Sequence, residues 1–424
     1  MFYRPDGRGG SIRGPDMSDH VPELPRLRAV EAFPIEHEGE QMILLRDPSG
    51  LAEAPLVVSP AGFFILTFFD GRHSLEQIAE AFQAQFGTAL PIEQLHEMLE
   101  QLDLGHYLDS QRFAAFYQEL VDAFRAAPAR VSRDAESFGA DEDGLGPMLD
   151  RMLGDGVAEP DPRNGRLVGL IAPHLDYPRG EPCYLAAYRV LAANGPIERA
   201  VILGANHFGR GTSVVATGKD FQTPLGLTRT DRAFLAELER ACGVDLCEHE
   251  FDHVREHSVE LQLLILQRLL GAENFEIVPI LCPDPCGPTG TAPYDGRGVD
   301  LEVFAQALGK LLRDADKRTI VIAGADLSHF GRRFGDDCEL DPPFLAEIER
   351  KDRESLGAVV AGRWDLFLEG IRGRNNDTRI CSAGSIYTLR RALPGARAEL
   401  LRYHQTVDRD SGTAVSCSAM ALWE

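Results

Sequence analysis

The chain has 424 residues, too many for one compact core, so two domains are expected. Its formal net charge of −23 disfavours nucleic acid and anionic membranes as partners, because both repel an acidic surface. No apolar stretch approaches the roughly 20 residues of a membrane span, and the first residues lack the apolar segment of a secretory signal. Eight cysteines are too few for a dense disulfide framework. We therefore expect a cytoplasmic protein.

The first 125 residues predict a disordered start and a small domain. Residues 1–25 are rich in Gly, Pro, Arg and Asp and should be disordered. Residues 26–125 should fold, and Ser74 with Gln77 forms a capping box at the start of a helix that Gly87 ends. The expected elements are a strand over 42–45, a helix beginning at 59–60, helices over 75–86 and 91–102, and a β-wing over 105–109. Three helices and a wing are typical of a winged-helix domain.

One segment of this domain contains a motif that can be compared with known folds. The run Asp70-Gly-Arg-His-Ser-Leu-Glu-Gln-Ile-Ala79, followed by Leu102 and Leu108, resembles the PqqD-like fold. That resemblance implies that a peptide is added as an extra strand, for which 42–45 is the expected edge. A helical accessory domain with purely structural duties is the alternative.

The rest of the chain predicts an α/β domain. Residues 126–164 mix Ala, Pro, Asp and Gly around an amphipathic stretch over 145–153, and are expected to form a linker or a helix leading into the second domain. Over 165–424, apolar runs alternate with helical patterns at 183–193, 231–242, 258–270, 301–315, 343–361 and 382–393. This alternation predicts a central, mostly parallel sheet flanked by helices.

Potential metal or proton-transfer ligands follow four short apolar runs of this domain. The runs over 167–172, 200–203 and 319–323 lead to His174, His207 and the pair Asp326 and His329, and Arg379-Ile380 leads to Cys381. Apolar runs of this kind predict buried parallel strands, and ligands gather at the carboxyl ends of such strands. Imidazole, carboxylate and thiolate groups meeting at one edge of a sheet indicate a transition-metal site. Each residue alone could be a solitary polar group at the end of a strand.

The order of several motifs resembles the Memo family, which in bacteria includes the AmmeMemoRadiSam system protein B. The motifs are Ile171-Ala-Pro-His174, Gly204-Ala-Asn-His207, Thr223-Pro-Leu-Gly226, Glu256-His-Ser-Val-Glu260, Asp326-Leu-Ser-His329-Phe-Gly331 and Cys381. The resemblance implies the fold of class III extradiol ring-cleaving dioxygenases. It also implies that His174, His207 and Cys381 bind iron or copper, and that Asp326 and His329 belong to the active site. A radical-SAM enzyme and an AMMECR-domain protein are the implied partners.

The chain departs from the family pattern around these ligands. Asp176 stands where Gly is usual, Phe208 replaces a second histidine, and Ser382 replaces the Gly after the cysteine. The customary Gly-x-Trp-Tyr-Pro motif is not recognisable near Phe138. The metal ligands are kept while the walls of the pocket differ, so the substrate is less well defined than the metal site.

The residue types suggest a division of roles. His174 and His207 are expected as neutral donors on adjacent strands, and Cys381 as a thiolate at a helix N-terminus, which favours copper or a soft state of iron. Asp326 and His329, three residues apart, would project together from a helical turn, with His329 as the acid/base. The alternatives are that Cys381 is a small buried hydrophobe and that Asp326 is an N-cap.

A second metal pattern overlaps the first. His253-Val-Arg-Glu-His257 fits the inverted zinc-peptidase motif H-x-x-E-H, which would need a regular helix and a further carboxylate ligand. We prefer Glu256 and His257 as catalytic residues that surround the metal ligands, with His249 and His253 on a solvated helix face. The expected function is a metal-dependent redox or dioxygenase-like enzyme acting on a small molecule or peptide. A non-catalytic metal- or peptide-binding scaffold is the alternative, and a zinc peptidase is a minor one.

Overall fold

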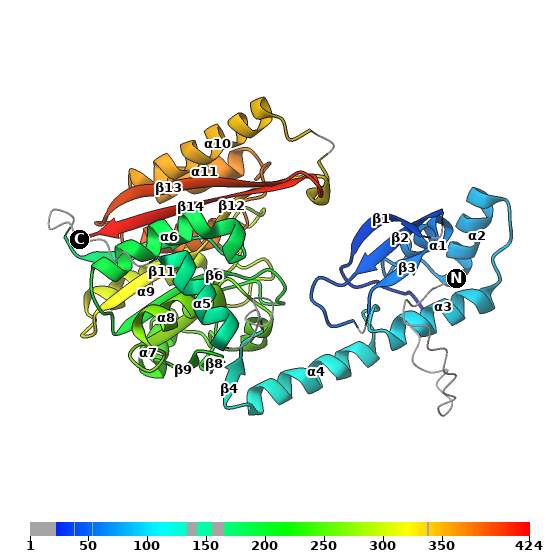
Figure 1. Cartoon of the computed structure of the whole chain (residues 1–424). Helices are drawn as coiled ribbons and strands as arrows, with labels where there is room; N and C mark the ends of the chain where they lie inside the picture. Colours follow the sequence, from blue (N-terminus) through cyan, green and yellow to red (C-terminus); the bar gives the residue numbers. More distant parts are fainter. Residues whose placement is uncertain (1–22, 38, 53, 134–141, 155–164, 337–338) are drawn as a thin grey trace. The chain divides into compact units, whose positions relative to one another are not determined.

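The computed structural model describes residues 23–37, 39–52, 54–133, 142–154, 165–336 and 339–424 (Figure 1). The chain divides into two compact units, Met1–Ala126 and Ala127–Glu424. Most of the segment expected to be disordered, and the region near Phe138, lie outside the described residues. Within the described ranges, no helix combines the length and apolarity needed to cross a membrane.

The N-terminal unit contains a three-stranded antiparallel sheet and a group of helices. The elements are β1 (Glu31–His37), β2 (Glu40–Arg46), β3 (Leu56–Val58), α1 (Pro60–Leu66), α2 (Leu75–Phe86), α3 (Ile92–Leu104) and α4 (Gln111–Ala126). The predicted capping box is present, because Ser74 accepts a bond from the amide of Gln77 and the Gln77 side chain accepts one from the amide of Ser74. Gly87 ends α2 with a φ of 69°, as its sequence position predicted.

The strand predicted at 42–45 is not an edge strand of the sheet. It lies within β2, which pairs with β1 on one side and β3 on the other. The main-chain groups of β2 are therefore used inside the sheet, and the expectation that a peptide pairs with this strand is wrong. In place of a wing strand, the segment over 105–109 forms an isolated antiparallel bridge between Leu108 and Leu27. The winged-helix assignment stays a prediction.

The C-terminal unit is built on an eleven-stranded sheet. Its strands are β4 (Ala129–Val131), β5 (Leu167–Ala172), β6 (Arg199–Ala205), β7 (Val215–Ala216), β8 (Asp220–Thr223), β9 (Gly226–Thr230), β10 (Glu276–Cys282), β11 (Thr319–Gly324), β12 (Asp326–Gly331), β13 (Arg397–Asp408) and β14 (Thr413–Trp423). Its helices are α5 (Glu142–Leu153), α6 (Tyr177–Ala193), α7 (Arg232–Cys242), α8 (Glu260–Leu270), α9 (Leu301–Arg313), α10 (Pro342–Val360), α11 (Trp364–Gly373) and α12 (Ala383–Ala392), with short 3₁₀ turns at Glu250–Val254 and Arg332–Phe334.

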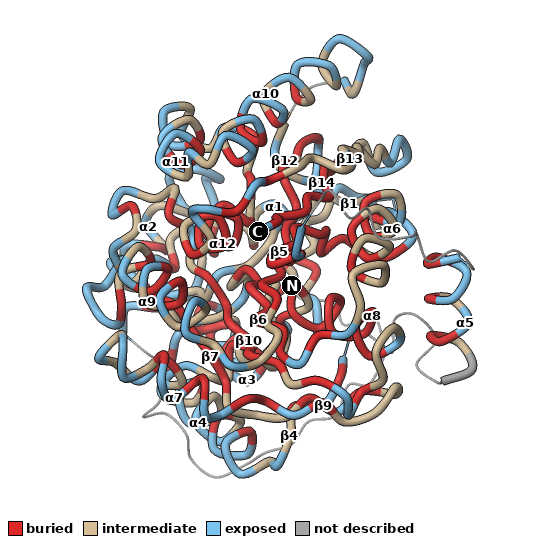
Figure 2. The backbone as a smooth tube through the Cα atoms, turned by 90° about the vertical axis from the view of Figure 1, so that its left-hand side faces the viewer, coloured by how far each residue is buried: buried red, intermediate tan, exposed pale blue. Residues whose placement is uncertain are grey.

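The middle of this sheet is parallel, and both of its faces are covered by helices. Strands β5, β11, β6, β10 and β9 are neighbours in that order and run parallel, and the antiparallel strands β14 and β8 lie beside β5 and β9. Figure 2 shows β5, β6 and β10 buried along almost their entire length, and β11 is buried except at its first residue. On β11, Ile320 and Ile322 pack into one core, and Val321 and Ala323 pack into the other. The predicted α/β architecture is confirmed.

Each face of the sheet has its own set of helices. Helices α5, α6 and α8 contribute to one core, and α7, α9, α11 and α12 contribute to the other. The order of strands also corrects one expectation, because β11 lies between β5 and β6. The strands that lead to His174 and His207 are therefore separated by one strand.

The segment expected as a linker contributes two elements to the larger unit. Strand β4 pairs in parallel with β8 at the margin of the sheet. Helix α5 includes the amphipathic stretch over 145–153, and it buries Leu145 and Leu149 completely against the core. Residues 134–141 and 155–164 lie outside the described residues.

Candidate metal centre

His174 follows β5 and is held by two contacts on β11 and β12. Its Nδ1 lies 2.9 Å from the carbonyl oxygen of Gly324, and its amide donates to Oδ1 of Asp326 at 3.1 Å. A carbonyl oxygen only accepts hydrogen bonds, so Nδ1 carries a proton and Nε2 is the nitrogen that becomes a donor when it loses its own proton. Burial opposes the charge of this imidazole, but Asp326 and Cys381 outweigh it and raise the pKa of His174 to about 9, whereas a neutral imidazole was expected. The side chain is 3% exposed. His174 is therefore fixed with Nε2 as its candidate metal-binding atom.

His207 follows β6 and is oriented by a buried carboxylate. Glu256 accepts a bond from the amide of His207 at 3.0 Å and lies 3.0 Å from its Nδ1. Burial opposes the charge on Glu256, but His207 outweighs it and lowers the pKa of this carboxyl. A carboxylate behind a metal-binding imidazole fixes the tautomer and increases the basicity of the other nitrogen. Here that nitrogen is Nε2 of His207.

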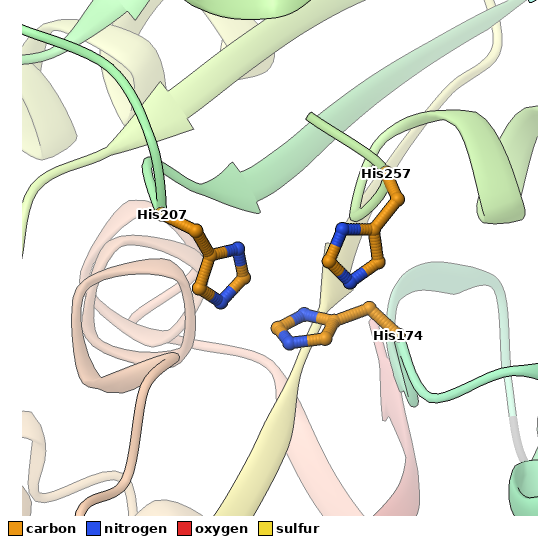
Figure 3. A group of neighbouring side chains, drawn as sticks. All are labelled: His174, His207 and His257. Atoms are coloured by element: carbon orange, nitrogen blue, oxygen red, sulfur yellow. The ribbon is translucent and has the colours of Figure 1, made fainter. Parts of the chain in front are cut away.

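His257 completes a group of three imidazoles that point toward one another (Figure 3). One ligand atom from each of His174, His207 and His257 lies within 4.8 Å of the others. The rings of His207 and His257 are stacked, with centroids 5.3 Å apart. Burial lowers the pKa of His257 to about 4, which leaves its imidazole neutral at physiological pH. We expected this residue only beside the ligands, whereas its position also permits direct coordination.

Cys381 lies next to this group, although it does not follow a strand. It is placed by the turn between α11 and α12, where Arg379 has a φ of 55°, so the expected strand at 379–380 is wrong. The Cys381 Sγ lies 3.3 Å from Nε2 of His174. Burial would raise the pKa of this thiol, but the imidazoles of His174 and His329 lower it well below its ordinary value. A thiolate therefore adjoins Nε2 of His174.

Asp326 and His329 lie on strand β12 rather than on a helical turn. The pairing of β12 with β14 is irregular between these two residues, as at a β-bulge. Both side chains interact electrostatically with Cys381, so both face the centre despite their odd spacing. The predicted proximity is therefore present, whereas the helical turn and the N-cap alternative are wrong.

These two residues differ in their surroundings. Oδ2 of Asp326 lies 3.5 Å from Nε2 of His174, and burial raises the pKa of the Asp326 carboxyl. Nδ1 of His329 lies 3.0 Å and 3.1 Å from the carbonyl oxygens of Leu327 and Arg379. Those contacts place the proton of His329 on Nδ1 and leave Nε2 as its basic atom.

The zinc-peptidase arrangement is not formed. The segment Glu250–Val254 is a 3₁₀ turn, and His253 is 1% exposed with Nε2 3.3 Å from the carbonyl oxygen of Val215. Burial lowers the pKa of His253 to about 3. The expectation that His253 is solvated is wrong. Its ring is directed at a main-chain carbonyl, and among the described residues it does not belong to the group formed by His174, His207 and His257.

One supporting residue was not expected from the sequence. Asp252 accepts bonds from the Nδ2 of Asn206 and from the amides of Arg210 and Gly211, at 2.8 to 3.0 Å. It thereby fixes the loop that carries His207. Neither strand periodicity nor ligand type distinguishes Asp252 from a surface acid, because its partners are brought close only by folding.

The fold and this cluster of donors define an α/β protein with a candidate transition-metal centre. A family model described as Memo-like protein matches residues 136–422, and the chain belongs to the Memo family. A MEMO1 family protein of Aquifex aeolicus is 23% identical over 352 residues, covering 83% of this chain and 87% of that protein. MEMO1 family proteins of Methanopyrus kandleri and Methanocaldococcus jannaschii are 31% and 34% identical, covering 57% of this chain and 77% and 78% of their own lengths.

Proposed function

We propose that this Memo-family protein is a redox or dioxygenase-like enzyme that binds iron or copper through His174, His207 and Cys381. The observation that carries the proposal is the orientation of the two imidazoles: both have Nδ1 engaged by an acceptor, and Nε2 of His174 adjoins the Cys381 thiolate. His257 is within reach as a further donor. This set fits the preferences of iron and copper for imidazole and thiolate, and it leaves coordination positions for a substrate.

The roles of the surrounding side chains follow from their contacts. When bound, the metal would supply Lewis acidity and one-electron redox chemistry. Glu256 holds His207 in place, and Asp326 holds the main chain at His174. His329 can accept a proton at Nε2, because its Nδ1 is bound to main-chain carbonyls. Proton transfer is thus assigned to His329 and ligand orientation to the two carboxylates.

We further propose that the substrate is a small molecule or peptide and that the reaction belongs to a cytoplasmic radical-SAM pathway. A radical-SAM enzyme and an AMMECR-domain protein would be the partners. The N-terminal unit would present the peptide or protein partner, as its resemblance to PqqD-like domains suggests. Because β2 is used on both sides, such a partner would have to bind elsewhere on that unit.

The metal assignment is tested by elemental analysis of protein purified without oxygen. We expect one equivalent of iron or copper, and at least about a tenfold loss of affinity for His174→Ala, His207→Ala and Cys381→Ala. His249→Ala is the control, since His249 is exposed in a nearby segment. Unchanged affinity in all three ligand variants would refute the site.

A measurement of turnover distinguishes the proposed enzyme from a non-catalytic scaffold. The metal-loaded protein should consume oxygen or another oxidant in a steady state, and His329→Ala should reduce that rate while the metal content stays the same. If the wild-type protein retains its metal but is inert and binds a peptide tightly, the non-catalytic scaffold is the better interpretation.

A further inference from the structure

A fully buried ion pair lies beside the metal centre and has no role in the proposed chemistry. Glu260, the first residue of α8, is 0% exposed, and Arg130 on β4 is 1% exposed. The guanidinium of Arg130 donates to one oxygen of Glu260, and the Ser132 hydroxyl donates to the other. Both carboxylate oxygens of Glu260 therefore accept hydrogen bonds from the segment that contains β4. Removing two charged groups from water costs free energy, so we looked for what this buried pair contributes to the structure around it.

The guanidinium of Arg130 also binds the main chain of the segment that carries Glu256 and His257. Its Nε donates to the carbonyl oxygen of His253 at 2.8 Å, and one terminal nitrogen donates to that of Glu256 at 3.0 Å. One planar group thus fixes both ends of the segment 253–256 and connects it to α8. Only an arginine can reach these acceptors together, because its donors form a rigid fork.

The fixed segment supplies two of the groups at the centre. The Glu256 carboxylate orients His207 through its amide and its Nδ1. His257 is the next residue along the chain, and its ring stacks on His207. A change in the main chain at Glu256 would therefore move the carboxylate and the His257 imidazole together, and second-sphere changes of this kind weaken metal binding.

We propose that Arg130 is a positioning residue of the metal centre, which holds Glu256 and His257 in place through the main chain of residues 253–256. The inference rests on the proposed function. Arg130 lies before residues 136–422, to which the family model is matched. Buried ion pairs contribute little net stability compared with apolar residues, so the contribution of this pair is the geometry of the segment rather than the free energy of unfolding.

The experiment measures binding of Co²⁺ to the full chain, with the thiolate-to-cobalt absorption band as a report on Cys381. Arg130→Lys keeps the positive charge opposite Glu260 but loses the fork. The double variant Arg130→Met with Glu260→Gln removes both charges, so that neither is left unpaired. We expect both variants to fold and to bind Co²⁺ about 10- to 100-fold more weakly, with a changed absorption spectrum.

The matched control is a second buried pair at the opposite end of β6. Arg199 donates through Nε to Oδ2 of Asp231 at 2.9 Å, and these side chains are 6% and 4% exposed. Arg199→Met with Asp231→Asn should lower the thermal midpoint without changing Co²⁺ affinity or the spectrum. Equal weakening by both double variants, or unchanged binding in Arg130→Lys and the Arg130 double variant, would overturn the positioning role. Failure of the unaltered chain to bind Co²⁺ would overturn the proposed function and this inference with it.

Discussion

At the scale of single residues, the centre depends on which ring nitrogen of each histidine is free. His174 and His207 are held through Nδ1 by different acceptors, a carbonyl oxygen of Gly324 and the carboxylate of Glu256. The main-chain acceptor carries no charge, whereas the carboxylate also stabilises a positive imidazole. His207 is therefore the candidate ligand whose donor strength is expected to depend most on a second side chain.

Glu256→Gln tests this dependence. The amide can still accept a hydrogen bond from His207 but carries no charge, so the basicity of the Nε2 donor should fall. We expect about a tenfold weaker metal affinity, unchanged stoichiometry at saturating metal and a lower turnover rate. Metal titration followed by calorimetry measures the affinity. Glu354→Gln, at an exposed position on α10, is the control, and equal affinities for the two variants would contradict the prediction.

A buried carboxylate outside the centre gives a pH dependence with a definite sign. Burial opposes the charge of Asp231, but Lys317, the amide of Phe234 and Arg199 outweigh it and lower its pKa from 3.8 to about 2. A lowered pKa stabilises the folded state above the unfolded-state value, and that contribution disappears as pH falls through the folded-state value.

Asp231→Asn should therefore cost about 2 kcal/mol of unfolding free energy at pH 7, since asparagine keeps the helix cap but not the charge. The difference from the wild-type protein should shrink between pH 4 and pH 2. Urea unfolding at several pH values measures it, with the exposed Asp316→Asn as the control. A difference that persists unchanged to pH 2 would show that the charge is not the cause.

At the scale of elements, the central strands of the sheet and the helices that cover it could be predicted from the sequence, whereas the turn before Cys381 could not. The runs over 167–172 and 320–323 contain no polar side chain, as expected for strands such as β5 and β11 that are buried on both faces. In contrast, the turn before Cys381 depends on Asn376, whose side chain bonds both the amide and the carbonyl of Ile380. Such local side-chain bonds leave no periodic signal in a sequence.

The strand order and the bulge in β12 could not be predicted from the sequence either. Placing β11 between β5 and β6 requires long-range pairing, which the order of motifs along the chain does not specify. The spacing of Asp326 and His329 fits a helical turn as well as a bulged strand. Their convergence with His174 could be predicted, because carboxyl ends of parallel strands share one edge.

The central position of β2 in the N-terminal sheet leads to a further prediction. Leu44 pairs with Phe33 on β1 and with Val57 on β3. Residues 27–126 expressed alone should unfold cooperatively, and Leu44→Pro should lower their stability by about 3 kcal/mol or more, because proline removes a main-chain donor. Thermal circular dichroism measures this, with Leu44→Ala as the control that keeps the donor. Equal stability of the two variants would mean that the donor of Leu44 is not used in the sheet.

At the scale of the whole molecule, the candidate metal centre belongs entirely to the C-terminal unit. All the candidate ligands and the residues that position them lie within 127–424, and α4 ends at the preceding residue. We propose that the functional unit begins at β4, because Arg130 on this strand is the buried partner of Glu260. The matched region of the family begins only at residue 136. A domain defined by that match alone would therefore leave Glu260 buried without its cation.

Two truncations distinguish these boundaries. Residues 127–424 should fold and bind Co²⁺ with the affinity of the full chain, since every group at the centre is retained. Residues 134–424 lack β4, Arg130 and Ser132, and leave the carboxylate of Glu260 without these partners, which should cost about 3–5 kcal/mol of unfolding free energy and weaken Co²⁺ binding about 10- to 100-fold. Thermal unfolding and Co²⁺ titration of the two truncations measure both effects. Equal affinities would show that β4 does not shape the centre, whereas weak binding by residues 127–424 would show that the N-terminal unit is itself required.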